Sequence, residues 1–130
     1  MKIPKGLKYA KTDEWIKAEG DEAVIGISDF AQDQLSDVVY VELMIDEGDS
    51  VSKGDTLATV ESVKAAADVI FPASGEIIEI NEGLADTPEA LNSDPYEAGW
   101  MVKMKLDDPS ELDDLMAADA YASFNEEREG

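Results

Sequence analysis

Two short apolar segments that flank a single lysine constrain the fold of this chain more than any other feature. The segments Asp55–Val60 and Asp68–Pro72 are rich in branched apolar residues, which favour strands. Turn signals with glycine or proline bound them on their outer sides, at Lys53–Asp55 and Pro72–Gly75. Strands this close in sequence pair most simply as a hairpin. The sequence therefore predicts a β-hairpin with Lys64 at or beside its exposed tip.

Lys64 is the only basic residue between Lys53 and Lys103, and small residues follow it at 65–67. A loop at the end of a rigid strand pair presents a side chain to other proteins in a fixed orientation. The ε-amine of a lysine displayed there can be acylated, which removes its charge and leaves a long neutral arm. The simpler interpretation is an ordinary solvated charge, which holds for most exposed lysines.

The residues around Lys64 favour a modified lysine over a solvated charge. Glu61 stands three positions before it, and Ser62, Val63 and Ala65 complete the stretch. This stretch resembles the acceptor site of lipoyl-carrying domains, in which an acidic residue precedes the lysine by three positions and alanine follows it. A biotin acceptor would carry methionine on both sides of the lysine, whereas Val63 and Ala65 stand there.

The composition argues against several classes of protein. With 31 acidic against 10 basic residues, the chain offers no basic patch for phosphate contacts, so no binding of nucleic acid is expected. The absence of cysteine and histidine excludes disulfides, thiolate or histidine-assisted nucleophiles, and metal sites built on those residues. Carboxylate pairs remain possible as a general acid and base, but among 31 acidic residues close pairs occur by chance, so no catalytic residue and no metal ligand stands out. The acidity is either a solvated surface or an attraction for partners with basic docking sites.

The length of the chain predicts a single domain over residues 1–130 with a modest core. The basic N-terminus, Met1–Lys8, is not followed by the apolar stretch of a signal peptide, and no apolar run reaches membrane length. We expect a cytoplasmic protein that does not bind membranes. A transit peptide removed earlier in processing is also compatible with the sequence.

Alternating patterns and glycine turns predict a mainly β fold, a compact sandwich of short strands around an approximate two-fold. Ser28 or Asp29 can cap a short helix at 29–35. The polar segment 81–98 contains two prolines, so we expect an irregular loop with one helical turn near 87–91. Besides the hairpin, the expected strands are Glu14–Glu19, Ala23–Ile27, Val38–Leu43, Gly75–Ile80 and Gly99–Leu106.

The C-terminal region predicts helices. Asp108 at the N-cap, a proline at the first helical position and Glu111 at the third form a variant of the capping box. A second helix is expected at about 118–127, where Tyr121 and Phe124 stand three residues apart and serve as packing anchors rather than cofactor ligands. The last residues of the chain are expected to fray.

Six separated stretches, in order along the chain, resemble the H-protein of the glycine cleavage system. An order-preserving match of this kind is more specific than the lysine motif alone. The stretches are Lys8–Trp15, Gly26–Gln32, Asp37–Leu43, Glu61–Ala65, Ser74–Asn81 and Leu91–Trp100. The resemblance covers nearly the whole chain and implies the family's fold, a lipoyl-domain-like β-sandwich (a barrel-sandwich hybrid) with helices at its edge.

The resemblance implies a monomeric carrier rather than an enzyme. Lys64 would hold lipoic acid in amide linkage, attached by a lipoate ligase or lipoyl transferase. The P-protein (glycine dehydrogenase, decarboxylating) would load the aminomethyl group of glycine onto this swinging arm. The T-protein (aminomethyltransferase) would pass the methylene to tetrahydrofolate, and the L-protein (dihydrolipoamide dehydrogenase) would reoxidise the arm. A chain without cysteine or histidine suits this role because the cofactor supplies the sulfur chemistry.

In the family, the arm loaded with the aminomethyl group folds back into a cleft of the carrier. Thr12, Glu14 and Asp68 match the contacting positions and offer one hydroxyl and two carboxylates to an ammonium with three donors. A nearby carboxylate favours the ammonium form, which suppresses loss of the group as formaldehyde and ammonia. Without the resemblance, both carboxylates would be interpreted as surface charges. Asp13 stands where the family commonly has histidine, and it either strengthens this attraction or faces solvent.

The sequence leaves other functions open. A lone lipoyl domain of a 2-oxo acid dehydrogenase is disfavoured by Glu14-Trp15 and by the C-terminal helices. An H-like lipoyl-relay carrier that serves other lipoyl-dependent enzymes is harder to separate. An acidic interaction protein without a prosthetic group would make Lys64 incidental. An independent enzyme is the weakest alternative because carboxylates and hydroxyls alone would have to supply its chemistry.

Overall fold

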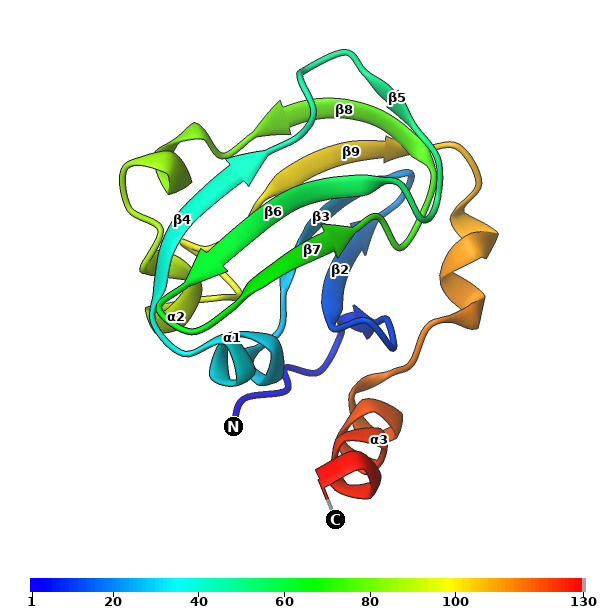
Figure 1. Ribbon diagram of the computed structural model, residues 1–130. Helices are drawn as coiled ribbons and strands as arrows, with labels where there is room; N and C mark the ends of the chain where they lie inside the picture. Colours follow the sequence, from blue (N-terminus) through cyan, green and yellow to red (C-terminus); the bar gives the residue numbers. More distant parts are fainter. Residues whose placement is uncertain (130) are drawn as a thin grey trace.

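The computed structural model describes residues 1–129 and contains two antiparallel sheets that face each other (Figure 1). This arrangement confirms the mainly β sandwich expected from the sequence. In order of pairing, the six strands of the larger sheet are β1 (Lys8–Tyr9), β2 (Glu14–Glu19), β3 (Glu22–Ile27), β9 (Val102–Leu106), β8 (Gly75–Ile80) and β5 (Ser50–Val51). The three strands of the smaller sheet are β4 (Val38–Leu43), β6 (Thr56–Ser62) and β7 (Ala66–Ile70).

Short helices lie at the edges of the sandwich. The helix α1 (Asp29–Leu35) begins after Ser28, whose Oγ accepts a hydrogen bond from the amide of Ala31 at 3.2 Å, as the capping pattern predicts. The other helices are the 3₁₀ helices η1 (Glu82–Ala85) and η2 (Pro109–Asp114) and the α-helices α2 (Ala90–Ser93) and α3 (Ala118–Glu129). Within residues 1–129, no helix has both the length and the apolar character needed to cross a membrane.

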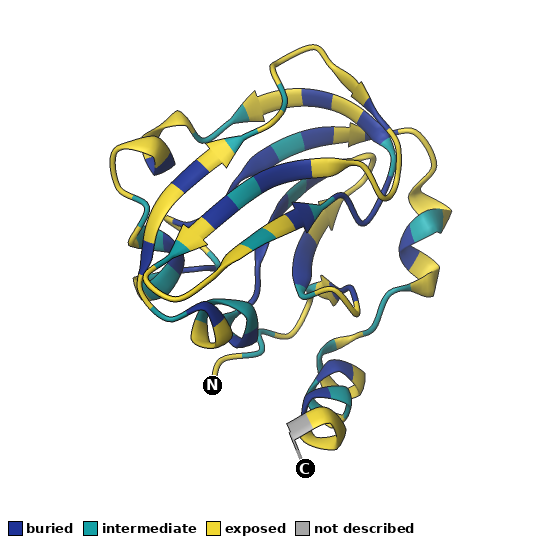
Figure 2. Ribbon diagram, viewed as in Figure 1, coloured by how far each residue is buried: buried dark blue, intermediate teal, exposed yellow. Residues whose placement is uncertain are grey.

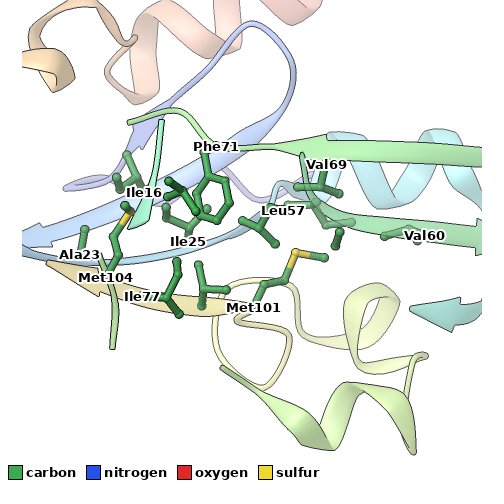
Figure 3. Packing of buried hydrophobic residues seen from close by; sticks show 14 of the residues in the cluster. Ile16, Ala23, Ile25, Leu57, Val60, Val69, Phe71, Ile77, Met101 and Met104 are labelled. Carbon is green, nitrogen blue, oxygen red and sulfur yellow. The ribbon is translucent and has the colours of Figure 1, made fainter. Parts of the chain in front are cut away.

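The core lies between the two sheets, where side chains from both inner faces meet (Figure 3). Leu57, Val60 and Val69 come from β6 and β7 and are between 0% and 4% exposed. Ile25 and Ile77 approach them from β3 and β8 and are also buried. Buried residues alternate with more exposed ones along β9 and the first part of β8, whereas β2 is buried along its first half and exposed along its second (Figure 2). Where residues alternate, the charged side chains take the outward positions, so a highly charged chain can still form strands.

A second, smaller cluster joins α3 to the N-terminal hairpin. The ring of Tyr121 stacks on that of Tyr9 with centroids 4.5 Å apart, and Phe124 packs against the same cluster. In Figure 1, α3 (orange to red) lies at the end of the molecule near β1, away from the core between the sheets. The prediction that these two aromatic residues anchor the C-terminal helix is confirmed.

The C-terminal helices confirm the sequence predictions except for the role of Glu111. Asp108 is the N-cap of the 3₁₀ helix η2 and accepts a hydrogen bond from the amide of Ser110 at 3.1 Å. Glu111 completes no capping box, because its carboxylate accepts hydrogen bonds from the amide and hydroxyl of Ser74 at 3.0 and 3.2 Å. The helix α3 continues to Glu129 through the tail that is expected to fray, and the final residue lies outside the described part.

The closing strand β9 starts at Val102 rather than at Gly99 as the alternation predicts. The amide of Gly99 donates to the carbonyl of Asp94 at 2.8 Å and closes the turn after α2. A Cβ at this glycine would lie 2.9 Å from the same carbonyl oxygen, so the chain is held against α2 and away from the sheet. The polar segment before it also contains η1 and α2, more helix than the single turn expected.

Gly75 gives a direct test of the sheet packing. It pairs with Val51 on β5 and with Leu106 on β9, and a Cβ built there would lie 2.2 Å from the carbonyl oxygen of Lys105. We predict that Gly75→Ala lowers the free energy of unfolding by about 1–3 kcal/mol, because the ladder must shift to admit the methyl group.

The matched control is Gly83→Ala in η1, where the nearest heavy atom lies 3.4 Å from the added Cβ. Its free energy of unfolding should stay within about 0.5 kcal/mol of the wild-type value. Urea unfolding followed by tryptophan fluorescence measures both variants. Equal stability of the two would contradict the packing described for Gly75.

Candidate functional site

The turn between β6 and β7 is held by the side chain of Ser62. The amides of Lys64 and Ala65 donate to Ser62 Oγ at 3.3 and 3.0 Å, and the amide of Ser62 donates to the carbonyl of Ala65 at 2.7 Å. These hydrogen bonds stabilise a turn that lacks the glycine or asparagine common in tight hairpin turns. The expected hairpin is confirmed, and Lys64 lies in its turn.

The side chains in this turn are open to solvent. Lys64 is exposed, and its neighbour Val63 is 68% exposed. Within residues 1–129, no ion pair involves Lys64. Glu61 is exposed at the last cross-strand pair before the turn, opposite Ala66. An amine in this position can be reached by a second protein, which an acylating enzyme requires.

Glu14 is buried, although its charge alone would favour the surface. It begins β2, directly before the buried Trp15, and is only 2% exposed. The hydroxyl of Thr12 donates a hydrogen bond to one carboxylate oxygen, and the amide of Ile70 donates to the other at 3.5 Å. The structure thus brings together Thr12 and Glu14 and joins both to the end of β7.

Burial changes the acidity of Glu14. Loss of hydration raises its pKa to about 7, because a charged carboxylate is disfavoured away from water. The negative charge of Asp13 also raises the pKa, while the hydrogen bonds from Thr12 and Ile70 act in the opposite direction. Near neutral pH the group populates both forms, and a cation beside it would shift the population to the carboxylate.

Asp68 lies on β7, two residues before Ile70, and is exposed. The hydroxyl of its cross-strand neighbour Thr59 donates to Asp68 Oδ1 at 3.3 Å. In the described part of the chain, no hydrogen bond joins Asp68 to Thr12 or Glu14. Asp68 therefore lies on the strand whose end meets Glu14, but only Thr12 and Glu14 are joined by a hydrogen bond.

A cleft of about 300 Å³ opens beside Thr12 and the end of β7. Its walls are mainly apolar and include Ile70, Phe71 and Met116, with Lys53 also lining it. Such a cleft can accept an apolar chain whose polar end meets the Thr12 hydroxyl. Among residues 1–129, no group of three acidic side chains lies close enough together to hold a metal ion.

Asp13 does not simply face solvent, which was one of the two alternatives that the sequence left open. Its backbone has a φ of 78°, in the left-handed region that aspartate tolerates better than most residues. Its carboxylate accepts a hydrogen bond from the hydroxyl of Tyr121 at 2.7 Å and forms an ion pair with Arg128. Sequence reasoning missed Arg128, although its spacing from Tyr121 and Phe124 places all three on one face of a helix.

Comparison with known proteins gives a consistent family assignment. The family model described as glycine cleavage H-protein matches residues 7–128. The glycine cleavage system H protein of Anaeromyxobacter sp. (strain K) is 50% identical over 129 residues, which are 99% of this chain and 100% of that protein. The mitochondrial glycine cleavage system H protein of Flaveria pringlei is 54% identical over 124 residues, which are 95% of this chain and 76% of that protein.

A solved structure extends the comparison to the fold. The crystal structure of a glycine cleavage system H protein from Mycobacterium marinum matches with a TM-score of 0.86 and 36% sequence identity, and the match covers 95% of this chain and 99% of that one. Sequence and fold therefore agree along nearly the whole chain. This chain belongs to the glycine cleavage H-protein family.

Proposed function

We propose that this chain is the lipoyl carrier of the glycine cleavage system and that Nζ of Lys64 holds the lipoyl group in amide linkage. The observation that carries the proposal is the position of Lys64 in an exposed turn of the hairpin whose far end meets the buried carboxylate of Glu14. The residues fit the group, because the amine is open to acylation and the cleft beside Thr12 is apolar.

The reach of the arm is compatible with these positions. At a strand rise of about 3.3 Å per residue, Asp68 lies at most about 13 Å from Lys64 along β7. An extended lysyl side chain that carries an eight-carbon acyl group has a similar length. The arm can therefore lie along the strand as far as Asp68, or extend into solvent toward a partner enzyme.

The protein would contribute position and shelter rather than sulfur chemistry. The bound lipoyl group would supply the disulfide that receives the aminomethyl group of glycine, since the chain has no cysteine. The partners would be the P-protein, which loads the arm, the T-protein, which unloads it to tetrahydrofolate, and the L-protein, which reoxidises it. The exposed turn would also give a lipoate ligase or lipoyl transferase access to Lys64.

Thr12, Glu14 and Asp68 would shelter the ammonium end of the cargo. A free amine can expel the thiolate, and water then completes the loss as formaldehyde and ammonia. The buried carboxylate of Glu14 would hold the amine as an ammonium, whose N–H groups donate to it and to the Thr12 oxygen. Asp68 would add a weaker attraction because it is exposed.

The names of the relatives favour glycine cleavage over a general lipoyl relay and over an acidic interaction protein without a prosthetic group. A cytoplasmic location stays a prediction, since the Flaveria relative is named as mitochondrial. We also propose that the carrier is a monomer and a single domain over residues 1–130.

Intact-mass spectrometry tests the attachment site. Incubation with lipoate, ATP and a lipoate ligase should add the mass of one lipoyl group to the wild type and nothing to Lys64→Arg, because arginine keeps the charge but has no acylatable amine. Lys17→Arg changes an exposed lysine on β2 that does not line the cleft and is the matched control, which should be modified like the wild type. An unmodified wild type or a modified Lys64→Arg would sink the assignment.

The same samples separate the glycine cleavage carrier from the lipoyl relay. Lipoylated wild type should restore glycine decarboxylation when mixed with the P-, T- and L-proteins, and Lys64→Arg should not. A fully lipoylated protein that supports no decarboxylation would favour the relay instead.

The shelter is tested by the lifetime of the loaded protein. Glu14→Gln should release formaldehyde about tenfold faster or more, because it removes a buried charge-assisted hydrogen bond. Asp68→Asn should release it about two- to fivefold faster, as expected for an exposed charge. Both variants should be lipoylated like the wild type.

The control for this measurement is Glu76→Gln, an exposed carboxylate on β8 in the other sheet. It should hold the adduct as long as the wild type does. If Glu14→Gln holds it equally long, the carboxylate shelter is wrong.

A further inference from the structure

The C-terminal helix α3 contacts the loop that contains Thr12 and leads into Glu14. Arg128 forms an ion pair with Asp13, and its Nη1 donates to Asp13 Oδ2 at 3.3 Å. The hydroxyl of Tyr121 donates to Asp13 Oδ1 at 2.7 Å. The Asp13 carboxylate thus accepts hydrogen bonds from two side chains of one helix, and its bidentate pairing with a guanidinium fixes its orientation.

Aromatic rings hold the guanidinium in place. The Arg128 Cζ atom lies 3.7 Å from the centroid of the Phe30 ring and 4.4 Å from that of Phe124. Contacts of this kind stabilise the cation and limit its conformations. Tyr121 is fully buried, and its hydroxyl also lies 2.6 Å from Ser28 Oγ. The contacts to Asp13 therefore come from side chains that are themselves fixed.

Asp13 occupies a loop position that usually favours glycine. The amide of Ala10 donates to the carbonyl of Glu14 and the amide of Asp13 donates to the carbonyl of Ala10, both at 2.9 Å, which defines a three-residue hairpin loop. The last residue of such a loop takes the left-handed conformation, and Asp13 has a φ of 78° there. Aspartate tolerates this conformation better than most residues other than glycine, and the contacts of Asp13 with α3 support it there.

We infer that Arg128 and Tyr121 are positioning residues of the shelter: by clamping Asp13 they hold its chain neighbours Thr12 and Glu14 in the geometry that receives an ammonium. This inference rests on the proposed function. The Thr12 hydroxyl bonds to Glu14 across Asp13, so the bond depends on the shape of the loop. Pairing with Arg128 also offsets the charge of Asp13, which would otherwise compete with Glu14 for the cation.

A carboxyl-carbon NMR titration of the unlipoylated protein tests the clamp without any cargo. In Arg128→Ala the loop loosens and Glu14 gains hydration, which lowers its pKa. The unpaired charge of Asp13 and a weaker hydrogen bond from Thr12 act in the opposite direction, but burial is the largest cause of the raised pKa, so the pKa should fall by about one unit, a tenfold change in acidity. Tyr121→Phe keeps the stack on Tyr9 but removes one donor, and it should give a smaller fall. Glu127→Ala, at an exposed position of the same helix, is the matched control and should leave the pKa unchanged.

A double-mutant cycle separates this role from a general effect on stability. Asp13→Asn keeps a residue that tolerates the left-handed conformation but removes its charge. If Arg128 acts through Asp13, then Arg128→Ala adds no further change to the Glu14 pKa in the Asp13→Asn background. Additive changes, an unchanged pKa in Arg128→Ala, or a rise of that pKa would each overturn the inference.

The lifetime of the loaded protein distinguishes the clamp from the shelter itself. Arg128→Ala should hold the adduct for a time between those of wild type and Glu14→Gln, with lipoylation of Lys64 unchanged. If Glu14→Gln does not shorten the lifetime, the shelter fails, while the titration still decides whether the clamp exists. If Glu14→Gln shortens the lifetime and Arg128→Ala does not, the clamp has no part in the shelter.

Discussion

The buried carboxylate of Glu14 connects the two parts of the molecule on which the proposed function depends. It accepts one hydrogen bond from the hydroxyl of Thr12 in the N-terminal hairpin and another from the amide of Ile70 in the hairpin that carries Lys64. Because burial raises its pKa to about 7, this group stabilises the fold below its ordinary pKa of about 4.5, and that contribution is lost as the pH rises through 7. Its burial therefore does not favour folding at neutral pH, which is typical of residues that serve a function. A carboxylate can also accept about four hydrogen bonds, so capacity remains for a bound donor.

Strand β7 gives the carrier its geometry. One end follows the turn with Lys64, and the other supplies the amide that meets Glu14, so the proposed attachment site and shelter share one rigid element. Pairing with β6 and burial of Val69 in the core keep this strand from moving independently. The clamp on Asp13 adds a second support from the C-terminal helix.

Local patterns in the sequence predict the features that depend on neighbours in the chain. The β-branched and aromatic residues at Val38–Leu43 predict β4 with its observed bounds, and the two strands that flank Lys64 predict the hairpin. Features that depend on contacts between distant segments are not accessible in this way. Arg128 meets Asp13 across a separation of 115 positions, and no local pattern links them. The burial of Glu14 also depends on a contact between distant segments, because it results from the packing of β7 against the N-terminal hairpin.

The pKa of Glu14 before and after the lipoylated protein is loaded with its aminomethyl group tests the central claim most directly. Carboxyl-carbon NMR can follow this single group through a pH titration in both states. An ammonium held against the carboxylate should lower the pKa from about 7 by about one to three units, since it favours the charged form. A loaded protein in which Glu14 titrates at the same pH as in the unloaded protein would contradict the account.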